Sequence, residues 1–115
     1  TKLCSEFIVK TMENYIIIRT RFFDKDKLFF EYYADDIITS SIEIKDFMIY
    51  LIKILNSDFK GVINIGSTSE SNFKKFSKIK KNIKKCKFLD IQKNINYTIA
   101  SNSTMNLDKL NKLFN

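Results

Sequence analysis

Two segments of the chain show the helical spacing of apolar residues. The first covers residues 2–13, where one stripe is formed by Leu3, Phe7, Ile8 and Met12. The second covers residues 44–55, and its apolar stripe is expected to face a core: Ile44, Phe47, Met48, Leu51, Ile52 and Leu55. A third, short helix is predicted over residues 106–114, which carry Leu107, Leu110 and Leu113.

Two continuous apolar runs predict buried strands. They are YIII at residues 15–18 and VINI at residues 62–65. Such runs are typical of parallel strands, because these are covered on both faces. Residues 36–44 alternate loosely and are expected to form one or two short strands, whereas residues 28–34 fit a short helix or a strand. Residues 88–100 are expected to be irregular, with short extended pieces.

Helices and buried strands alternate along the chain. This order predicts an α/β fold with parallel strands. No internal repeat and no Gly-, Ser- or Pro-rich linker divides residues 1–115, so they are expected to form a single piece. Two buried strands are too few for a self-sufficient parallel sheet, which needs neighbours on its edges and helices on both faces. We therefore expect the chain to be part of a larger α/β protein.

The net charge of +7 comes from one segment. Residues 74–87 hold eight of the twenty basic residues and no acidic residue, so the remainder is nearly neutral. Ser67 followed by Glu70 matches a capping box, and apolar residues then recur at near-helical spacing: Phe73, Phe76, Ile79 and Ile83. A Lys-rich amphipathic helix is therefore predicted over residues 69–87. Its lysines are expected to form a solvated face, with a phosphate or nucleic-acid patch as the alternative.

Composition excludes several kinds of chemistry. The chain has no His, which excludes His-based catalysis and the common zinc sites for this segment. Cys4 and Cys86 have no metal-binding or redox spacing, so we predict no metal site and expect reduced thiols in a cytoplasmic protein. No apolar run reaches the roughly 18 residues that a membrane helix needs, and no membrane contact is expected.

Five short motifs occur in order along nearly the whole chain. They are TKLCSE (1–6), YIIIRT (15–20), IKDFM (44–48), GVINIG (61–66) and TMNLDKL (104–110). The ordered series, rather than any single motif, resembles the carboxyl-terminal part of the extended short-chain dehydrogenase/reductase superfamily. It is most similar to the dTDP-4-dehydrorhamnose reductase-like branch, beside the related NAD-dependent sugar-nucleotide epimerases and dehydratases.

The resemblance implies a fold, a cofactor and a substrate class. The fold would be the C-terminal part of a Rossmann-type doubly wound parallel sheet with a small substrate-binding subdomain. The cofactor would be NAD or NADP, bound mainly by an amino-terminal half that residues 1–115 do not include. The substrate would be a nucleotide sugar used in polysaccharide or deoxysugar synthesis, and the full-length protein could form a homodimer.

The resemblance also implies roles for particular residues. Lys2 matches the lysine of a Tyr-x-x-x-Lys motif, which makes it a catalytic and cofactor-binding residue. On a helix this spacing places both side chains on one face, so that the ammonium lowers the pKa of the tyrosine. Thr20 is implied in cofactor binding, and Arg21 and Phe22 in substrate binding, because they follow a strand at the carboxyl end of the sheet.

The chain departs from the family pattern in several places. The Gly-rich dinucleotide motif and the catalytic Tyr with its Ser/Thr partner are absent, and residues 99–103 (IASNS) lack the Arg-Pro pair that often precedes the closing motif. The isolated chain is therefore expected to be inactive and marginally stable, whereas its full-length parent is expected to be an enzyme. Two alternatives stay open: a small basic module that binds nucleic acid or an acidic partner through helix 69–87, and a catalytically inactive scaffold.

Overall fold

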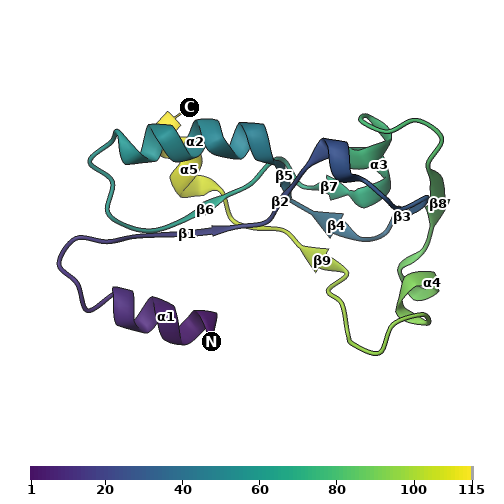
Figure 1. Cartoon of the computed structure of the whole chain (residues 1–115), viewed down its shortest axis with the longest axis horizontal. Helices are drawn as coiled ribbons and strands as arrows, with labels where there is room; N and C mark the ends of the chain where they lie inside the picture. Colours follow the sequence, from purple (N-terminus) through teal and green to yellow (C-terminus); the bar gives the residue numbers. More distant parts are fainter. Residues whose placement is uncertain (115) are drawn as a thin grey trace.

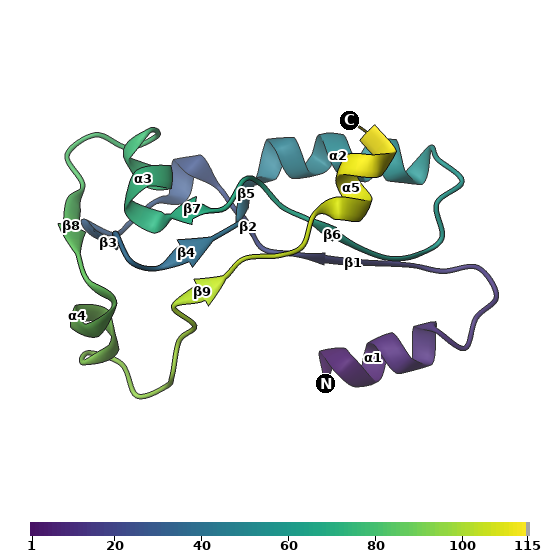
Figure 2. The same cartoon turned by 180° about the vertical axis from the view of Figure 1, so that it is seen from behind.

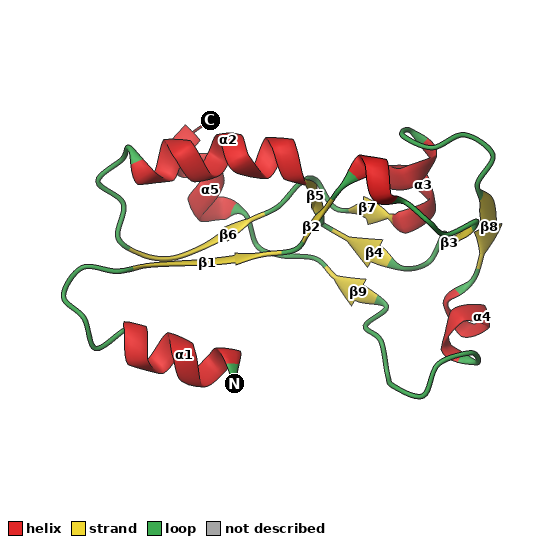
Figure 3. Ribbon diagram, viewed as in Figure 1, coloured by secondary structure: helices red, strands yellow, loops and turns green. Residues whose placement is uncertain are grey.

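The molecule is elongated along its two longest strands, β1 (Ile16–Thr20) and β6 (Gly61–Ile65) (Figure 1). The computed structural model describes residues 1–114 and has principal extents of 47 × 30 × 23 Å. These strands and three α-helices form one end of the molecule, whereas short strands, two further α-helices and a 3₁₀ helix form the other end (Figure 3). The fold is mixed α/β, as predicted.

The two strands predicted from the apolar runs pair in parallel, but only Ile17, Ile63 and Ile65 within them are buried. Their register extends from Ile16 opposite Gly61 to Thr20 opposite Ile65. Gly61 enters β6 with φ +108°, a left-handed conformation that glycine adopts without a steric penalty. Neither strand has a second partner strand within residues 1–114, so both outer edges of this sheet are unpaired there.

Helices lie on both faces of this sheet. Helices α2 (Ile44–Leu55) and α5 (Asp108–Phe114) lie on one face, and α1 (Lys2–Val9) lies on the other, as two opposite views show (Figures 1 and 2). The core fills the space between the sheet and the first two helices, and its buried residues are Ile42, Ile54, Ile63, Ile65 and Leu110. Helix α5 confirms the prediction over residues 106–114, and it begins at Asp108, whose N–H donates to Oδ1 of Asn106.

Helix α2 has the predicted bounds, but the predicted buried stripe is partly wrong. Ile54 is fully buried, and Phe47 and Tyr50 pack against the core. Three residues of the predicted stripe are instead 44–63% exposed: Met48, Ile52 and Leu55. The helix is apolar over more than one face, so its periodicity alone does not specify which face meets the sheet.

Helix α1 ends at Val9, four residues before the predicted end, and turns lead from it to β1. None of its residues is buried. The expected stripe of Leu3, Phe7, Ile8 and Met12 is 63–70% exposed. An ion pair between Glu6 and Arg19 joins α1 to β1.

The other end of the molecule is built from pairs of short strands. The central strand β4 (Ile38–Thr39) is antiparallel to β7 (Glu70–Ser71) and parallel to β9 (Asn102–Ser103). The remaining strands pair in parallel: β2 (Phe22–Phe23) with β5 (Ile42–Glu43), and β3 (Tyr32–Ala34) with β8 (Lys84–Cys86). Strands β4 and β5 confirm the prediction of one or two short strands in residues 36–44, and β3 shows that the end of the segment 28–34 is a strand.

The Lys-rich helix predicted over residues 69–87 is wrong. Helix α3 (Asn72–Ser77) has six residues, and its N-cap is Ser71, whose hydroxyl accepts the N–H of Lys74. The predicted capping box is also wrong, because Glu70 belongs to β7 and forms an ion pair with Lys78. Asn82 has φ 65°, which takes the chain out of any helix and leads it into β8.

Residues 88–100 were predicted to be irregular, but they contain a short helix. Helix α4 (Phe88–Gln92) begins after Lys87, whose N–H donates to the carboxylate of Asp90. A short 3₁₀ helix, η1 (Lys25–Lys27), follows Asp24. Here the carboxylate of the residue before the helix accepts the N–H of Asp26. Both are turns fixed by one acidic side chain.

Candidate functional site

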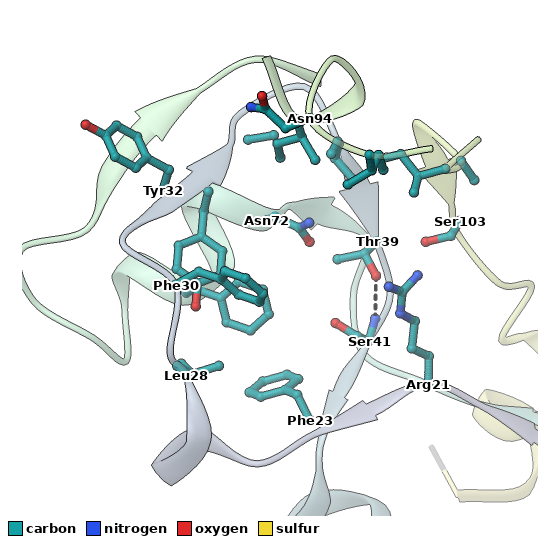
Figure 4. Close-up of a pocket in the computed structure, with 18 of the residues that line it drawn as sticks. Arg21, Phe23, Leu28, Phe30, Tyr32, Thr39, Ser41, Asn72, Asn94 and Ser103 are labelled. Atoms are coloured by element: carbon teal, nitrogen blue, oxygen red, sulfur yellow. Dashed lines mark hydrogen bonds between the residues drawn. The ribbon is translucent and has the colours of Figure 1, made fainter. Parts of the chain in front are cut away.

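A cavity of about 840 Å³ begins where β1 ends (Figure 4). Arg21 directly follows β1 and lines this cavity, together with residues of β2, β3, β4 and α3. The segment from α4 to β9 closes the opposite side. The cavity therefore lies at the carboxyl end of a parallel strand pair, the position at which open α/β sheets bind ligands.

One wall of the cavity is aromatic. The ring of Phe76 lies at the centre, 4.9 Å from the ring of Phe23 and 4.9 Å from the ring of Tyr33. The ring of Phe30 meets Tyr33 edge to face at 6.4 Å. Such a wall gives a ligand a broad apolar face for a sugar ring or a base.

Polar side chains line the opposite part of the cavity. Figure 4 shows the Arg21 guanidinium beside Thr39 and Ser41, with Asn72 and Asn94 farther along. The Thr39 hydroxyl accepts the N–H of Ser41 at 3.1 Å, which fixes this part of the wall. The backbone carbonyl of Arg21 accepts the N–H of Ile42, but its guanidinium forms no ion pair or hydrogen bond within residues 1–114.

The charge inside the cavity is positive. Glu31 also lines it, but its carboxylate is 2.7 Å from Nζ of Lys84, and this hydrogen bond holds the pKa of Glu31 below its ordinary value. The Glu31 charge is therefore neutralised by Lys84, whereas Arg21 has no such partner among the described residues. A ligand with an anionic group is the one that this arrangement favours.

Two of the predicted site residues lie at this cavity. Arg21 and Phe22 both line it, and the half-exposed ring of Phe22 stacks on Phe47 at 5.3 Å. Thr20 is adjacent in sequence but does not line the cavity; its hydroxyl donates to the carbonyl of Ile65 at 2.8 Å. Lys2 is exposed in the first turn of α1 and does not line the cavity either.

Two residues of the sequence motifs join helix α1 to strand β1. The guanidinium of Arg19 donates two hydrogen bonds to the Glu6 carboxylate, at 3.0 and 2.6 Å. The Arg19 guanidinium holds the pKa of Glu6 below its ordinary value, and the carboxylate raises the pKa of Arg19. Arg19 therefore fixes α1 on β1 rather than facing the cavity.

The sequence analysis missed several cavity residues. Ile91, Asn94 and Ile99 come from a segment that was expected to be irregular. Gln92 shapes this segment, because its amide donates to the carbonyl of Tyr97 at 2.8 Å and accepts the N–H of Ile99 at 3.2 Å. No periodicity marks these residues, since hydrogen bonds of the Gln92 and Asn94 side chains hold the loop.

Most lysines of residues 74–87 have partners inside the protein. Three form ion pairs: Lys78 with Glu70, Lys84 with Glu31 and Lys87 with Asp35, at 2.7–2.9 Å. Lys80 donates to the carbonyls of Leu28 and Phe30. The segment therefore joins distant parts of the fold, which leaves little unpaired positive charge for a phosphate backbone.

Within the described residues, no group of three or more His, Cys, Asp and Glu side chains could hold a metal ion. Cys4 and Cys86 are free thiols. In the same part of the chain, every helix is too short or too polar to cross a membrane.

Comparison of the chain with protein-family models, with curated proteins and with solved structures finds no match. Three features of the chain bear on its function: the cavity, the parallel strand pair that leads to it and the ordered motifs. These three features agree in position, because Arg21 and Phe22 follow the second motif directly.

Proposed function

We propose that the chain is the carboxyl-terminal, substrate-binding part of an NAD(P)-dependent sugar-nucleotide reductase of the dTDP-4-dehydrorhamnose reductase-like kind, or of a related epimerase or dehydratase. The observation that carries this proposal is the position of the cavity at the carboxyl end of β1. Ligands of Rossmann-type sheets bind at that edge. The short strands and helices α3 and α4 then form the substrate-binding part.

The lining of the cavity suits a nucleotide sugar. The unpaired Arg21 guanidinium can hold a phosphate through two parallel hydrogen bonds. The aromatic wall around Phe76 offers its faces to a sugar or a base, and the amides of Asn72 and Asn94 can hydrogen-bond to hydroxyl groups. A volume of about 840 Å³ lies within the range of small-molecule sites.

The catalytic part of the proposal concerns Lys2. In this arrangement Lys2 stands one helical turn after the catalytic tyrosine and lowers its pKa, which is about 10 for a free phenol. Glu6 and Arg19 hold α1, and with it Lys2, against β1. NAD or NADP supplies the hydride when bound. The Thr20 hydroxyl already donates to Ile65, so towards the cofactor it can only accept.

Uncovered surfaces also support the proposal. The outer edges of β1 and β6 are unpaired within residues 1–114, and the apolar stripe of α1 is exposed. Further parallel strands beside β1 and β6 would satisfy the backbone groups of both edges. A dinucleotide-binding half of a doubly wound sheet would supply such strands.

Titration of the 115-residue chain with a nucleotide sugar tests whether the cavity is a substrate-binding site. In calorimetric titrations with dTDP-glucose we expect saturable binding, and we expect Arg21→Gln to weaken it about 10- to 100-fold through loss of charged hydrogen bonds. Lys60→Gln is the matched control, because it removes the same charge just before the amino end of β6. Equal affinity of the Arg21 variant and the wild type, or no binding at all, would contradict the proposal.

The coding sequence upstream of Thr1 tests the catalytic part independently. The proposal requires a tyrosine three residues before Thr1, and a Gly-rich strand–turn–helix farther upstream. Another residue in place of that tyrosine would leave a catalytically inactive scaffold as the better description.

A further inference from the structure

Lys75 is buried without an acidic partner. It lies on α3, only 5% of its surface is exposed, and it forms no ion pair within residues 1–114. The acid that acts on its charge is Glu70, whose carboxylate is bound by Lys78 at 2.8 Å. The Nζ of Lys75 instead lies 2.6 Å from the carbonyl oxygen of Ser41 and 2.6 Å from Oγ of Ser67. A buried amine that faces a hydroxyl is an arrangement used for nucleophile activation.

Ser67 lies between this amine and a second cavity. That cavity, of about 630 Å³, lies between α2 and α5 at the carboxyl end of β6, and Ser67, Thr68, Asp46 and Lys53 line it. Lys75 does not line it, so the amine is behind the hydroxyl and away from the solvent. A small molecule in the cavity could therefore reach the oxygen of Ser67 but not Lys75.

Backbone geometry holds Ser67 in place. The preceding residue is Gly66, where a Cβ would lie 2.6 Å from the carbonyl oxygen of Ser40, so only glycine allows this approach. The N–H of Ser67 then donates to that carbonyl at 2.8 Å. This contact places the Ser67 hydroxyl 2.6 Å from the Ser41 carbonyl, within the triangle that it forms with Lys75.

The protonation state of Lys75 decides whether its amine can accept a proton from the Ser67 hydroxyl. Burial lowers the pKa of Lys75; Lys78 lowers it further, and Glu70 acts in the opposite direction. The charged ammonium donates to both oxygens. The neutral amine can keep one N–H on the Ser41 carbonyl while its lone pair accepts the proton of the Ser67 hydroxyl.

We propose that Ser67 is a nucleophile with Lys75 as its general base, and that the second cavity is an acyl-transfer site for small carboxylic esters. The oxygen of Ser67 adds to the ester carbonyl while its proton moves to Lys75. The bond to the alcohol then breaks, and the departing alkoxide takes a proton from a water molecule in the cavity. The hydroxide that remains adds to the acyl carbon, and the carboxylic acid is released as the Lys75 ammonium returns its proton to the Ser67 oxygen.

Thr68 completes the site. It follows the nucleophile, lines the same cavity, and its N–H has no acceptor within residues 1–114. The N–H of the residue after the nucleophile can stabilise the negative oxygen that forms during attack.

Covalent labelling of the whole chain with a fluorophosphonate tests the proposal. The Ser67 oxygen displaces fluoride from phosphorus, and mass spectrometry identifies the labelled peptide. We expect label on Ser67, none in Ser67→Ala, and an unchanged rate in Ser69→Ala, the matched control two residues away. Lys75→Met should label about 100-fold more slowly, since a general base contributes a factor of about 100 or more. Hydrolysis of p-nitrophenyl acetate should follow the same order.

The wild-type chain provides a measurement that needs no variant. The labelling rate should rise with pH as Lys75 loses its proton, and Lys75→Arg, which keeps the charge but cannot act as a base at neutral pH, should remove this rise. An unlabelled Ser67 in the wild type, a rate independent of pH, or equal rates for the wild type and a folded Lys75→Met would each overturn the proposal. None of these outcomes depends on the binding of a nucleotide sugar.

Discussion

At the scale of single residues, Tyr33 has a hydroxyl that the fold leaves unsatisfied. The side chain is 7% exposed, its hydroxyl makes no hydrogen bond of standard geometry among the described residues, and burial raises its pKa against a smaller lowering by the backbone of Phe30. An unsatisfied buried polar group costs about 1–3 kcal/mol. Tyr33→Phe keeps the ring contacts with Phe30 and Phe76, so we expect the free energy of unfolding to rise by about 1 kcal/mol.

Urea denaturation of the Tyr33 variant measures this change through the midpoint. Tyr97→Phe is the control, because Tyr97 is 67% exposed and loses no buried group. A lower midpoint for Tyr33→Phe would show that its hydroxyl makes a stabilising contact.

The sequence predicted some site residues and missed others for physical reasons. Arg21 and Phe22 follow a continuous apolar strand, and the strand end places them at the cavity. Lys75 was expected on a solvated face, but its amine reaches the Ser41 carbonyl, 34 residues earlier in the chain. That burial is a tertiary contact, and spacing within a segment carries no information about it.

At the scale of elements, the attachment of α1 depends on one carboxylate. The hydrogen bond from Arg19 lowers the pKa of Glu6 below its ordinary value of 4.5. A carboxylate with a lowered pKa stabilises the folded contact above its ordinary pKa, and this stabilisation is lost as pH falls through the lowered value. We therefore expect α1 to separate from β1 in acid, as the pH falls through the lowered pKa of Glu6.

NMR shifts of the α1 amides and of the Arg19 Nε–H group measure this separation. Glu6→Gln should give the acid-type shifts already at pH 7, whereas Glu13→Gln, which changes a carboxylate outside this ion pair, should keep the wild-type shifts. Wild-type α1 shifts in Glu6→Gln at pH 7 would mean that other contacts hold the helix.

Among the elements, those with one strong local signal were predictable. The apolar runs identified β1 and β6, and the stripe from Ile44 to Leu55 identified α2 with its bounds. The prediction of one long helix in the Lys-rich segment was wrong. The near-helical spacing of its apolar residues runs through a short helix, a turn at Asn82 and a strand. Strand β8 forms because it pairs with β3, and this contact between distant parts of the chain is not encoded in the local sequence.

At the scale of the whole molecule, the net charge of +7 overstates the charge available to a polyanion. Because several lysines of residues 74–87 are bound within the fold, we expect no measurable binding of duplex DNA at about 150 mM salt. Fluorescence anisotropy measures this binding. The variant Glu31→Gln, Asp35→Asn, Glu70→Gln releases three of these lysines and should bind DNA more tightly at low salt. Micromolar affinity of the wild type at 150 mM salt would instead support the basic-module alternative.

The strand pairings have a consequence for how the chain reaches this fold. The nearest partners are Phe22 and Ile42, the farthest are Ile38 and Asn102, and residues 1–114 contain no hairpin. Every sheet hydrogen bond therefore requires closure of a long loop, and folding slows as the mean separation of contacts grows. Helix α2 should form first, whereas β1 and β6 remain unpaired until the long loop between them closes. During that interval, pairing between strands of different chains competes with folding, so refolding yield should fall as protein concentration rises.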